Sequence, residues 1–594
     1  MQDPALERGP YVPLARPLGH RAPAPDDEAG LPLPLPIPVS GHRCRYAERE
    51  SFETVPGSQT GCRYMKPEMT MGTDEKRALG ERADGDALTI PSGRGRLRPP
   101  VRAIGSARRA ALLACLAIVA GFAATAAVPA HAAAAPAPAA AAPASRGLNA
   151  REHAAAIVLA RERTRFLARF ATHPDRPFTT SFMAWRRELD ASRLHRTLEQ
   201  MPKGGMLHIH STATGNAEWI VARAFTEPGC FIYWGPASDT YFRGQLEFFP
   251  TAEAPPGWVA AEELERTVPG LRSRLLRLYT LGPEDESEPD PWKEFEAIFT
   301  RVDGLVSYRP VFVAHYAHAF LRLARDGVQF VELRTSLSAV LAEDGSIIVD
   351  EGVLDLYRQA LAAVRARYPD FDLRLILSAR RAGTLEQAAD KLARQRRLAA
   401  TAPDLLYGFD LIGQEDVGNS TAFFAPALTT LPQVPLLLHS GESLSPANTN
   451  VGEALELGAP RIGHGLNMGL FPGLEDEVRE AGVTIEVCPL SNQALRYVPD
   501  LRRHPAKGWL QRGMRLVLGS DDPAIFGSTG LTDDLSVAYL SWGIGLRTLK
   551  RMALRSITAS SLPQDRKERQ RTIFERRWRR WVTAVAASGR VATR

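Results

Sequence analysis

The amino-acid sequence predicts an α/β fold, a (β/α)8 barrel of the TIM type with extra N-terminal helices and a C-terminal helix. Two observations support this fold class. Strand-like apolar runs alternate with helical stretches, which is typical of parallel sheets built from βαβ units. The number of runs is eight, as this barrel requires. The runs span residues 205–210, 328–334, 372–378, 405–412, 435–442, 461–465, 483–489 and 515–521.

A doubly wound open sheet is the alternative architecture for this pattern. That fold commonly binds phosphate groups at a glycine-rich turn that opens a helix. No such glycine-rich fingerprint opens any helical stretch between the eight runs. The pattern therefore favours the barrel, whose chemistry lies at the carboxyl ends of its strands.

Composition and charge restrict the class of protein. With 44% hydrophobic and 24% charged residues, the 594-residue chain resembles a soluble globular protein with ample core material. A net charge of +6 over this length indicates no polyanionic partner such as nucleic acid. Five cysteines are too few for a disulfide framework, and Cys44, Cys62 and Cys115 precede the predicted mature chain.

The first element in chain order is a predicted leader, residues 1–132. Up to about residue 100 it is rich in Pro, Gly and Arg and has no apolar period. A basic flank, Arg108-Arg109, then precedes an apolar run and a small-x-small site at Ala132, which is typical of a secretory signal peptide over about 105–132. We therefore expect a secreted or periplasmic protein without stable membrane insertion after cleavage. A membrane anchor is the alternative, because the run approaches spanning length.

The remaining elements follow from composition and periodicity. The Ala/Pro-rich stretch 133–147 is expected to be a flexible linker. Apolar residues at mixed three-and-four spacing predict helices over 148–200, and the barrel is expected over 201–562, with an insertion at about 215–285. A C-terminal helix is predicted over 563–594. Its apolar stripe is interpreted as a packed face beside a solvated basic face, with membrane or nucleic-acid contact as the alternative; the stripe comprises Phe574, Trp578, Trp581, Val582 and Val585.

Candidate metal ligands gather at the ends of the predicted strands. His208 and His210 are two residues apart, so both imidazoles face the same side of the first strand. Zinc binds imidazole nitrogen and carboxylate oxygen, and a catalytic zinc site keeps a position open for water. His439, in the fifth run, and Asp521, at the end of the eighth, complete a predicted set of four protein ligands.

Three polar residues beside these ligands are candidates for catalysis. Glu442, three residues after His439, is placed to handle a proton near the substrate. His464, in the sixth run, is expected either to accept the proton of a metal-activated water or to hold the hydroxide by charge. Asp522 follows Asp521 and is expected to point toward the substrate.

Two further features have structural interpretations. Glu332 and Arg334, in the second run, are interpreted as an ion pair at the barrel mouth rather than as substrate contacts. Cys488 would lie on an interior strand and is interpreted as a small core residue. The PCxxC signature of the unrelated zinc nucleobase deaminases is absent, so base flipping is not implied.

Five motifs follow one another along the predicted barrel. They are Met201-Pro202-Lys203 ahead of His208-Ile209-His210; His439-Ser440-Gly441-Glu442; Arg461-Ile462-Gly463-His464-Gly465; Glu486-Val487-Cys488-Pro489-Leu490-Ser491-Asn492-Gln493; and Ser520-Asp521-Asp522-Pro523. Together they resemble the adenosine deaminase family, most closely its secreted growth factor branch, the adenosine deaminase 2 type. The resemblance covers about residues 150 to 587.

The resemblance implies hydrolytic deamination of adenosine, and of 2′-deoxyadenosine, with a purine nucleoside as the small-molecule partner. It implies one Zn²⁺ per subunit, held by His208, His210, His439 and Asp521. By the same resemblance, Glu442 donates a proton to the purine ring, His464 positions and deprotonates the water, and Asp522 orients water and ring. The backbone of Gly413 meets the far edge of the purine, with Trp292 and Glu218 as candidates for the sugar side. A homodimer through the 148–200 helices is also implied.

Three departures from the family pattern leave two other functions open. Ser440 replaces the usual Ala, and Ser378-Ala379-Arg380-Arg381 stands where the branch has a His after the third strand. The insertion contains a single cysteine, Cys230, so the disulfide of that branch is not expected. One alternative is a related hydrolase acting on another aminopurine or a modified nucleoside, and the departure at Arg380 is the feature that supports it. The other is a secreted binding or signalling protein without turnover.

Overall fold

The structure is a computed structural model and describes residues 147–238, 240–249, 254–282 and 290–591. The predicted leader with its signal peptide, and the linker up to residue 146, lie outside the described residues.

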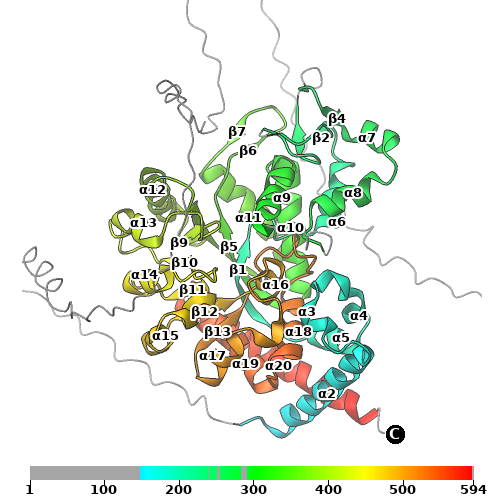
Figure 1. The fold of residues 1–594 in the computed structure, drawn as a ribbon, viewed down its shortest axis with the longest axis vertical. Helices are drawn as coiled ribbons and strands as arrows, with labels where there is room; N and C mark the ends of the chain where they lie inside the picture. The colour runs from blue at the N-terminus through cyan, green and yellow to red at the C-terminus, as the bar shows by residue number, and fades with distance from the viewer. Residues whose placement is uncertain (1–146, 239, 250–253, 283–289, 592–594) are drawn as a thin grey trace, which may run out of the picture. The chain divides into compact units, whose positions relative to one another are not determined.

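Eight parallel strands form the centre of the described chain (Figure 1). They make two four-stranded sheets with the orders β1-β5-β8-β9 and β10-β11-β12-β13. Parallel bridges join the sheets on both sides, since Phe409 pairs with Leu436 and Ile209 pairs with Asp521. The sheet therefore closes, which confirms the predicted barrel and makes the open sheet wrong. The strands are β1 (Gly204–His210), β5 (Val328–Thr335), β8 (Asp372–Arg380), β9 (Leu406–Ile412), β10 (Leu437–Ser440), β11 (Arg461–His464), β12 (Thr484–Val487) and β13 (Arg515–Leu518).

Some strands are shorter than the apolar runs because the chain turns where polar residues begin. Strand β10 ends at Ser440, and Gly441 follows with φ +78°. A Cβ on Gly441 would lie 2.5 Å from Asn467 Oδ1, so both conformation and space require glycine there. As a result, Glu442 lies past a turn at the end of β10 rather than on the strand.

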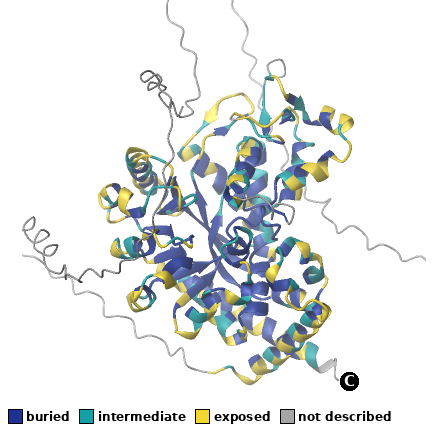
Figure 2. Cartoon of the chain, viewed as in Figure 1, coloured by how far each residue is buried: buried dark blue, intermediate teal, exposed yellow. Residues whose placement is uncertain are grey.

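Helices connect the strands and cover the outside of the barrel. Figure 2 shows buried strands at the centre and exposed residues on the outer faces of the helices. Helix α12 illustrates how the sequence starts a helix, because Thr384 and Gln387 form a reciprocal capping box at its first turn. None of the helices in the described ranges is both long and apolar enough to cross a bilayer. The connecting helices are α9 (Pro291–Val306), α10 (Arg309–Arg325), α11 (Glu351–Arg365), α12 (Leu385–Thr401), α13 (Thr421–Leu428), α14 (Asn450–Glu456), α15 (Leu474–Ala481), α16 (Pro489–Ala494), α17 (Ala506–Gln511), α18 (Leu531–Ser541) and α19 (Leu546–Thr558). A short hairpin, β6 (Val340–Leu341) and β7 (Ile347–Ile348), follows β5.

The connection between β1 and β5 carries an inserted unit with its own core. Its antiparallel sheet has the order β3-β2-β4, and Ile232, Leu246 and Leu275 are fully buried within the unit. Cys230 is buried there with a free thiol, and Cys488 is likewise free and fully buried in the barrel. The elements are α6 (Ala217–Ala224), β2 (Cys230–Tyr233), β3 (Leu246–Phe248), β4 (Trp258–Ala260), α7 (Ala261–Thr267) and α8 (Leu271–Leu278).

Helices from the two ends of the described chain pack together. Helix α2 (Ala150–Leu167) lies along α20 (Gln564–Val591), as Figure 1 shows. The buried carboxylate of Glu152 accepts hydrogen bonds from Lys550 Nζ at 2.6 Å and from Trp578 Nε1 at 2.8 Å. The apolar stripe of α20 is buried, which confirms its interpretation as a packed face: Phe574, Trp578, Trp581, Val582 and Val585. The other helices ahead of β1 are α3 (Arg176–Thr179), α4 (Arg186–Asp190) and α5 (Arg193–Glu199).

Candidate metal centre and active site

The four predicted ligands lie together at the carboxyl ends of the strands. His208 and His210 come from β1, His439 from β10, and Asp521 follows β13. His439 Nε2 is 3.0 Å from His208 Nε2 and 3.2 Å from His210 Nε2. Asp521 Oδ1 is 3.3 Å from His208 Nε2 and 3.1 Å from His210 Nε2. The four candidate ligand atoms are therefore linked in a ring of contacts of 3.0 to 3.3 Å, although their residues are far apart in the sequence.

Tight backbone packing makes room for this cluster. A Cβ on Gly463 would lie 2.7 Å from His208 Cε1, so strand β11 can pass the imidazole only with glycine there. His464 and Asp521 both have φ near +60°, at 66° and 57°, a conformation that costs on the order of 1–3 kcal/mol outside glycine. The strained residues are two of the candidate functional groups, as is common at active sites.

A buried ion-pair network lies behind two of the histidines. His208 Nδ1 donates to Glu486 Oε2 at 2.8 Å, and His439 Nδ1 donates to Asp410 Oδ2 at 2.7 Å. Arg334 joins the two carboxylates, with Nη2 at 2.6 Å from Glu486 and Nε at 2.6 Å from Asp410. The network fixes both imidazole rings in place.

The predicted ion pair between Glu332 and Arg334 is wrong. The two side chains share one face of β5 but pair in opposite directions, because Glu332 Oε2 accepts from Arg461 Nη2 at 2.5 Å while Arg334 reaches Asp410 and Glu486. Both residues are fully buried inside the barrel rather than at its mouth. Register across the barrel, which the sequence does not display, decides these partners.

The donor set fits a divalent metal ion. Since Nδ1 of His208 and His439 donates to a carboxylate, each Nε2 carries a bare lone pair. The lone pairs of two unprotonated nitrogens 3.0 Å apart repel one another unless a cation lies between them. Burial lowers the pKa of His439 to about 4, so its ring is neutral at pH 7. Neutral imidazoles with one carboxylate are zinc-type ligands.

Replacing Asp410 with Asn tests this network. The amide would present an N–H₂ group to at least one of its donor partners, so the His439 ring would lose its orientation. We expect Asp410→Asn to weaken Zn²⁺ binding by about 10–100-fold, as removal of such partners typically does. Competition with a chromogenic chelator measures the affinity. The matched control is Asp404→Asn, an exposed carboxylate paired with Arg358, and equal zinc affinity in both variants would contradict the expectation.

Glu442 and Asp522 are buried acids beside the cluster. Burial raises the pKa of Glu442 well above its ordinary value, with further contributions from the charges of Asp521 and Glu415. Burial and then the charge of Asp521 likewise raise the pKa of Asp522. Glu442 Oε1 is buried without a hydrogen-bond partner and lies 3.5 Å from His464 Nδ1. A carboxyl whose pKa is raised beside candidate metal ligands is suited to donate a proton to a substrate.

Glu415 holds Glu442 in place, and the sequence did not identify Glu415 as a site residue. Its buried carboxylate accepts from the backbone N–H of Gly441 at 3.0 Å and of Glu442 at 2.8 Å. It also accepts from the side-chain amides of Asn448 and Asn450. All four partners are donors, so an ionised carboxylate is the side chain that satisfies them. The available signal was a carboxylate two residues past Gly413, close to the end of the fourth run.

Replacing Glu415 with Gln introduces a donor where four donors converge. The amide would push at least one partner away and shift the turn that carries Glu442. Because a displacement of about 1 Å can cost roughly 10²-fold in rate, we expect Glu415→Gln to lower kcat by about 10–100-fold with little change in zinc content. Steady-state kinetics with metal analysis checks this. A variant with wild-type kcat would show that Glu415 is not needed to hold Glu442.

The structure places some of the predicted substrate-side residues near the candidate metal ligands and one of them, Glu218, outside this cluster. Gly413 follows β9 with φ +101°, and its nearest side-chain atom, Glu296 Oε1, is 4.0 Å from the position of a Cβ. Trp292 Nε1 donates to Tyr497 OH at 2.8 Å, and burial and then the charge of Glu442 raise the pKa of Tyr497. Trp292 therefore lies on the active-site side. Glu218 is exposed on the first turn of α6, where it accepts from Asn216, outside the buried cluster.

The residues that depart from the family pattern have defined places. Ser440 is fully buried, and its hydroxyl donates to the carbonyl of His439 at 2.7 Å, so the extra oxygen is satisfied locally. Arg381 is buried and donates to the same carbonyl at 2.7 Å, which braces β10. Arg380 ends β8 with 64% of its side chain exposed, 3.9 Å from Glu296. Of Ser440, Arg380 and Arg381, Arg380 is the exposed residue.

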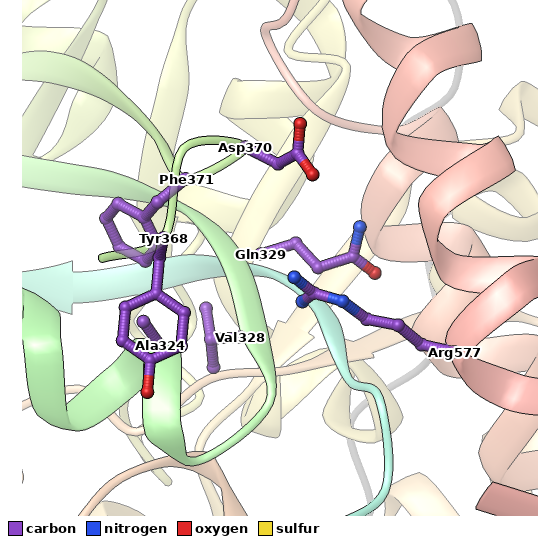
Figure 3. A pocket seen from close by; sticks show the side chains of 7 residues that line it. All are labelled: Ala324, Val328, Gln329, Tyr368, Asp370, Phe371 and Arg577. Carbon is purple, nitrogen blue, oxygen red and sulfur yellow. The ribbon is translucent and has the colours of Figure 1, made fainter. Parts of the chain in front are cut away.

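A hollow lies at the end of the barrel opposite the candidate metal centre (Figure 3). It is bounded by the start of β5, with Val328 and Gln329, and by Arg577 of α20, whose side chain points toward Gln329. Asp370 is the single carboxylate in its lining. The strand ends that carry the metal ligands are remote from this hollow, so it takes no part in the site.

A parallel barrel with such a cluster at the carboxyl ends of its strands is the architecture of a metal-dependent hydrolase. Comparison with known proteins narrows this class. Residues 284–574 match the model of the family described as Adenosine deaminase. The chain is 32% identical to Adenosine deaminase 2 of Sus scrofa, over 67% of this chain and 82% of that protein. It is 30% identical to Adenosine deaminase 2 of Homo sapiens, over 69% of this chain and 84% of that protein.

The chain belongs to the adenosine deaminase family. It is therefore a hydrolytic deaminase that acts on C–N bonds of cyclic amidines, with small purines as substrates, and this family is metal-dependent. Among solved structures, arabidopsis ADAL complexed with IMP shares the fold, with a TM-score of 0.50 and 17% identity over 64% of this chain and 98% of that one.

Proposed function

We propose that this protein is a zinc-dependent deaminase that converts adenosine, and 2′-deoxyadenosine, to inosine products and ammonia. The observation that carries the proposal is the placement, at one strand-end site, of the His208, His210, His439 and Asp521 side chains together with a buried glutamate, Glu442, whose pKa burial raises. His464 also lies within reach of this cluster, since His208, His439, His464 and Asp521 offer ligand atoms within 4.8 Å of one another. The relatives named Adenosine deaminase 2 support adenosine as the substrate.

The proposed ligands are His208, His210, His439 and Asp521. Three imidazoles with one carboxylate suit zinc better than the hard cations that prefer all-oxygen sites. When bound, the metal ion supplies Lewis-acid chemistry that lowers the pKa of a water toward about 7, so that a nucleophile is present at neutral pH. Burial raises the pKa of Asp521, but the neighbouring imidazoles outweigh it and hold the carboxylate ionised.

Each remaining step belongs to a named side chain. Glu442 donates its proton to the purine ring, which makes C6 electrophilic. Asp522 orients the ring and the attacking water, and the backbone at Gly413 meets the far edge of the purine. His464 Nε2, which is buried without a hydrogen-bond partner 3.7 Å from Asp521 Oδ2, faces the position of the water. The water oxygen forms a bond to C6, one water proton joins the departing amine and the other restores the proton that Glu442 gave up. The C6–N bond breaks and ammonia leaves.

A substrate panel tests the proposed specificity. We expect purified enzyme to remove the ultraviolet band of adenosine and 2′-deoxyadenosine and to release one ammonia for each inosine formed. Adenine, AMP and an N6-methylated nucleoside are the competitors. The exposed Arg380 at the end of β8 favours one alternative substrate, an aminopurine with an anionic or modified substituent. Faster turnover of AMP than of adenosine would contradict the proposed specificity and support this alternative.

The alternative without turnover predicts a different outcome. A binding or signalling protein would keep its biological effect in a variant that cannot release ammonia. The intact ligand cluster and the position of Glu442 support an enzyme instead. Export and homodimerisation remain predictions: N-terminal sequencing of the exported protein would check cleavage near Ala132, and light scattering would check the dimer.

A further inference from the structure

Three side chains that can bind a metal ion meet outside the strand-end site, where helix α5 packs against both α4 and α18 (Figure 1). Asp190 ends α4, His195 lies on α5, and Asp533 lies in the first turn of α18. His195 Nε2 is 3.2 Å from Asp533 Oδ1 and 3.8 Å from Asp190 Oδ1, and the three atoms lie within 4.8 Å of one another. Asp533 is fully buried and His195 is 8% exposed, so two of the three groups are held inside the fold.

Hydrogen bonding alone leaves one oxygen of this cluster unsatisfied. The single proton that His195 Nε2 can carry points to one acceptor, and Asp533 Oδ1 is the nearer of the two. Asp190 Oδ1 is buried and has no hydrogen-bond partner among the described residues. Arg186 Nε lies 3.4 Å from the other oxygen of Asp190, and the backbone N–H of Thr529 donates to the other oxygen of Asp533 at 2.7 Å. These outer contacts leave the Oδ1 atom of each carboxylate facing the imidazole.

The electrostatic balance of the cluster favours a cation. With a neutral imidazole, its two carboxylates and the nearby Glu199 bring three negative charges and Arg186 brings one positive charge, which leaves −2. Lys203 pairs with Asp326 at 3.6 Å and does not change this surplus. Burial raises the pKa of Asp190, and the charge of the facing carboxylate raises it further, against the effect of Arg186. A divalent cation between the carboxylates would neutralise the surplus.

Protonation of His195 does not satisfy the cluster. Burial lowers the pKa of His195, but the hydrogen bond and charge of Asp533 and the charge of Asp190 outweigh it and raise the pKa. The imidazolium still offers a single proton at Nε2, so Asp190 Oδ1 stays without a donor. A metal ion that displaces this proton contacts all three ligand atoms at once.

The spacing and chemistry of the three atoms suit an ion of the zinc type. Zinc binds nitrogen and oxygen at about 2.0–2.2 Å, so the ligand atoms of a tetrahedral site lie about 3.3–3.6 Å apart. The two separations from His195 Nε2, 3.2 and 3.8 Å, bracket this range. One imidazole nitrogen with two carboxylate oxygens suits transition metals, whereas Mg²⁺ and Ca²⁺ prefer oxygen ligands alone. A fourth position is left for water.

We propose that Asp190, His195 and Asp533 form a second metal site, which binds a divalent transition metal ion of the zinc type and joins helices α4 and α5 to the start of α18. The site goes beyond the proposed function, because none of its three residues belongs to the strand-end cluster. It has three protein ligands instead of four, and the side chain of Asp190 is 40% exposed, so it binds zinc more weakly than the strand-end site. Purified protein is therefore expected to keep one zinc ion and to take up the second on titration.

Calorimetric titration of Zn²⁺ into the full chain, already loaded with one zinc ion, counts the added ion. We expect one further equivalent for each chain. Thermal unfolding of the same samples should shift to a higher Tm, because an ion that binds only the folded state stabilises it.

The variant Asp190→Asn removes one ligand and keeps the contact between His195 and Asp533. We expect it to fold, to keep the first zinc ion and the wild-type rate of ammonia release, and to lose both the second equivalent and the rise in Tm. His195→Gln, which removes the nitrogen ligand, should show the same loss. The matched control is Asp175→Asn, an exposed carboxylate paired with Arg502 at 2.6 Å, which should behave like the wild type.

Two results would overturn the proposal: saturation of the wild-type protein at one zinc ion, or a second equivalent that both Asp190→Asn and His195→Gln retain. The two metal sites respond to different substitutions, since His439→Ala is expected to remove the first ion and Asp190→Asn the second. A protein that takes up the second ion but releases no ammonia would refute the proposed deaminase and leave this site in place.

Discussion

Replacing Glu442 with Gln is expected to lower kcat by about 10²–10⁴-fold while zinc remains bound, because proton transfer from a positioned acid contributes about that factor. Glutamine keeps the shape of the side chain and its backbone contacts with Glu415, but it cannot give up a proton to the purine ring. None of the four proposed ligands is changed. Ammonia release and zinc content, measured on the same preparation, check both parts.

The pH dependence of the same variant adds a second criterion. Burial, then the charges of Asp521 and Glu415, raise the pKa of Glu442, so its proton is retained to higher pH than in an ordinary glutamate and is lost as pH rises through the raised pKa. The wild-type rate should therefore fall on the alkaline side, and Glu442→Gln should lack this decline. Glu386→Gln, an exposed residue of α12, is the control. A Glu442→Gln enzyme with the wild-type rate would eliminate Glu442 as the acid.

Replacing His439 with Ala should remove metal and activity together. His439 Nε2 lies 3.0 Å from His208 Nε2 and 3.2 Å from His210 Nε2, so its loss opens the site on one side. Without the ion, water returns from a pKa near about 7 to its ordinary value near 15.7, and we expect a larger loss of kcat than for Glu442→Gln.

The control for His439→Ala is His153→Ala, an exposed imidazole on α2. Circular dichroism distinguishes a folded, metal-free protein from an unfolded one, since Asp410 loses a partner in the variant but keeps Arg334. A zinc-free His439→Ala protein that deaminates at the wild-type rate would refute the ligand assignment. Retained zinc with lost activity would move His439 from the ligand set to another role.

The fold and the ligand cluster could be predicted because both follow from local pattern. Apolar runs separated by helical periods define eight strands, and in this architecture strand ends converge, so His208, His439 and Asp521 could be placed together without coordinates. The turn at Gly441 illustrates the limit of such patterns. The apolar run continues to Glu442, but close approach to Asn467 and a positive φ end the strand two residues earlier.

The residues that hold the site in place could not be predicted in the same way. The partners Arg334 and Glu486 lie on strands 152 residues apart, and their pairing depends on how the barrel closes. The same reason made Glu332 an apparent partner of Arg334, although Glu332 in fact reaches Arg461.

We propose that deamination by this chain depends on one divalent ion held at the barrel mouth by His208, His210, His439 and Asp521. Zinc content per chain, measured alongside ammonia release from adenosine before and after treatment with a chelator, tests this dependence most directly. We expect one zinc ion per chain, release of ammonia equal to inosine formed, loss of both signals on chelation, and recovery when zinc is returned. Undiminished ammonia release from protein stripped of metal would contradict it.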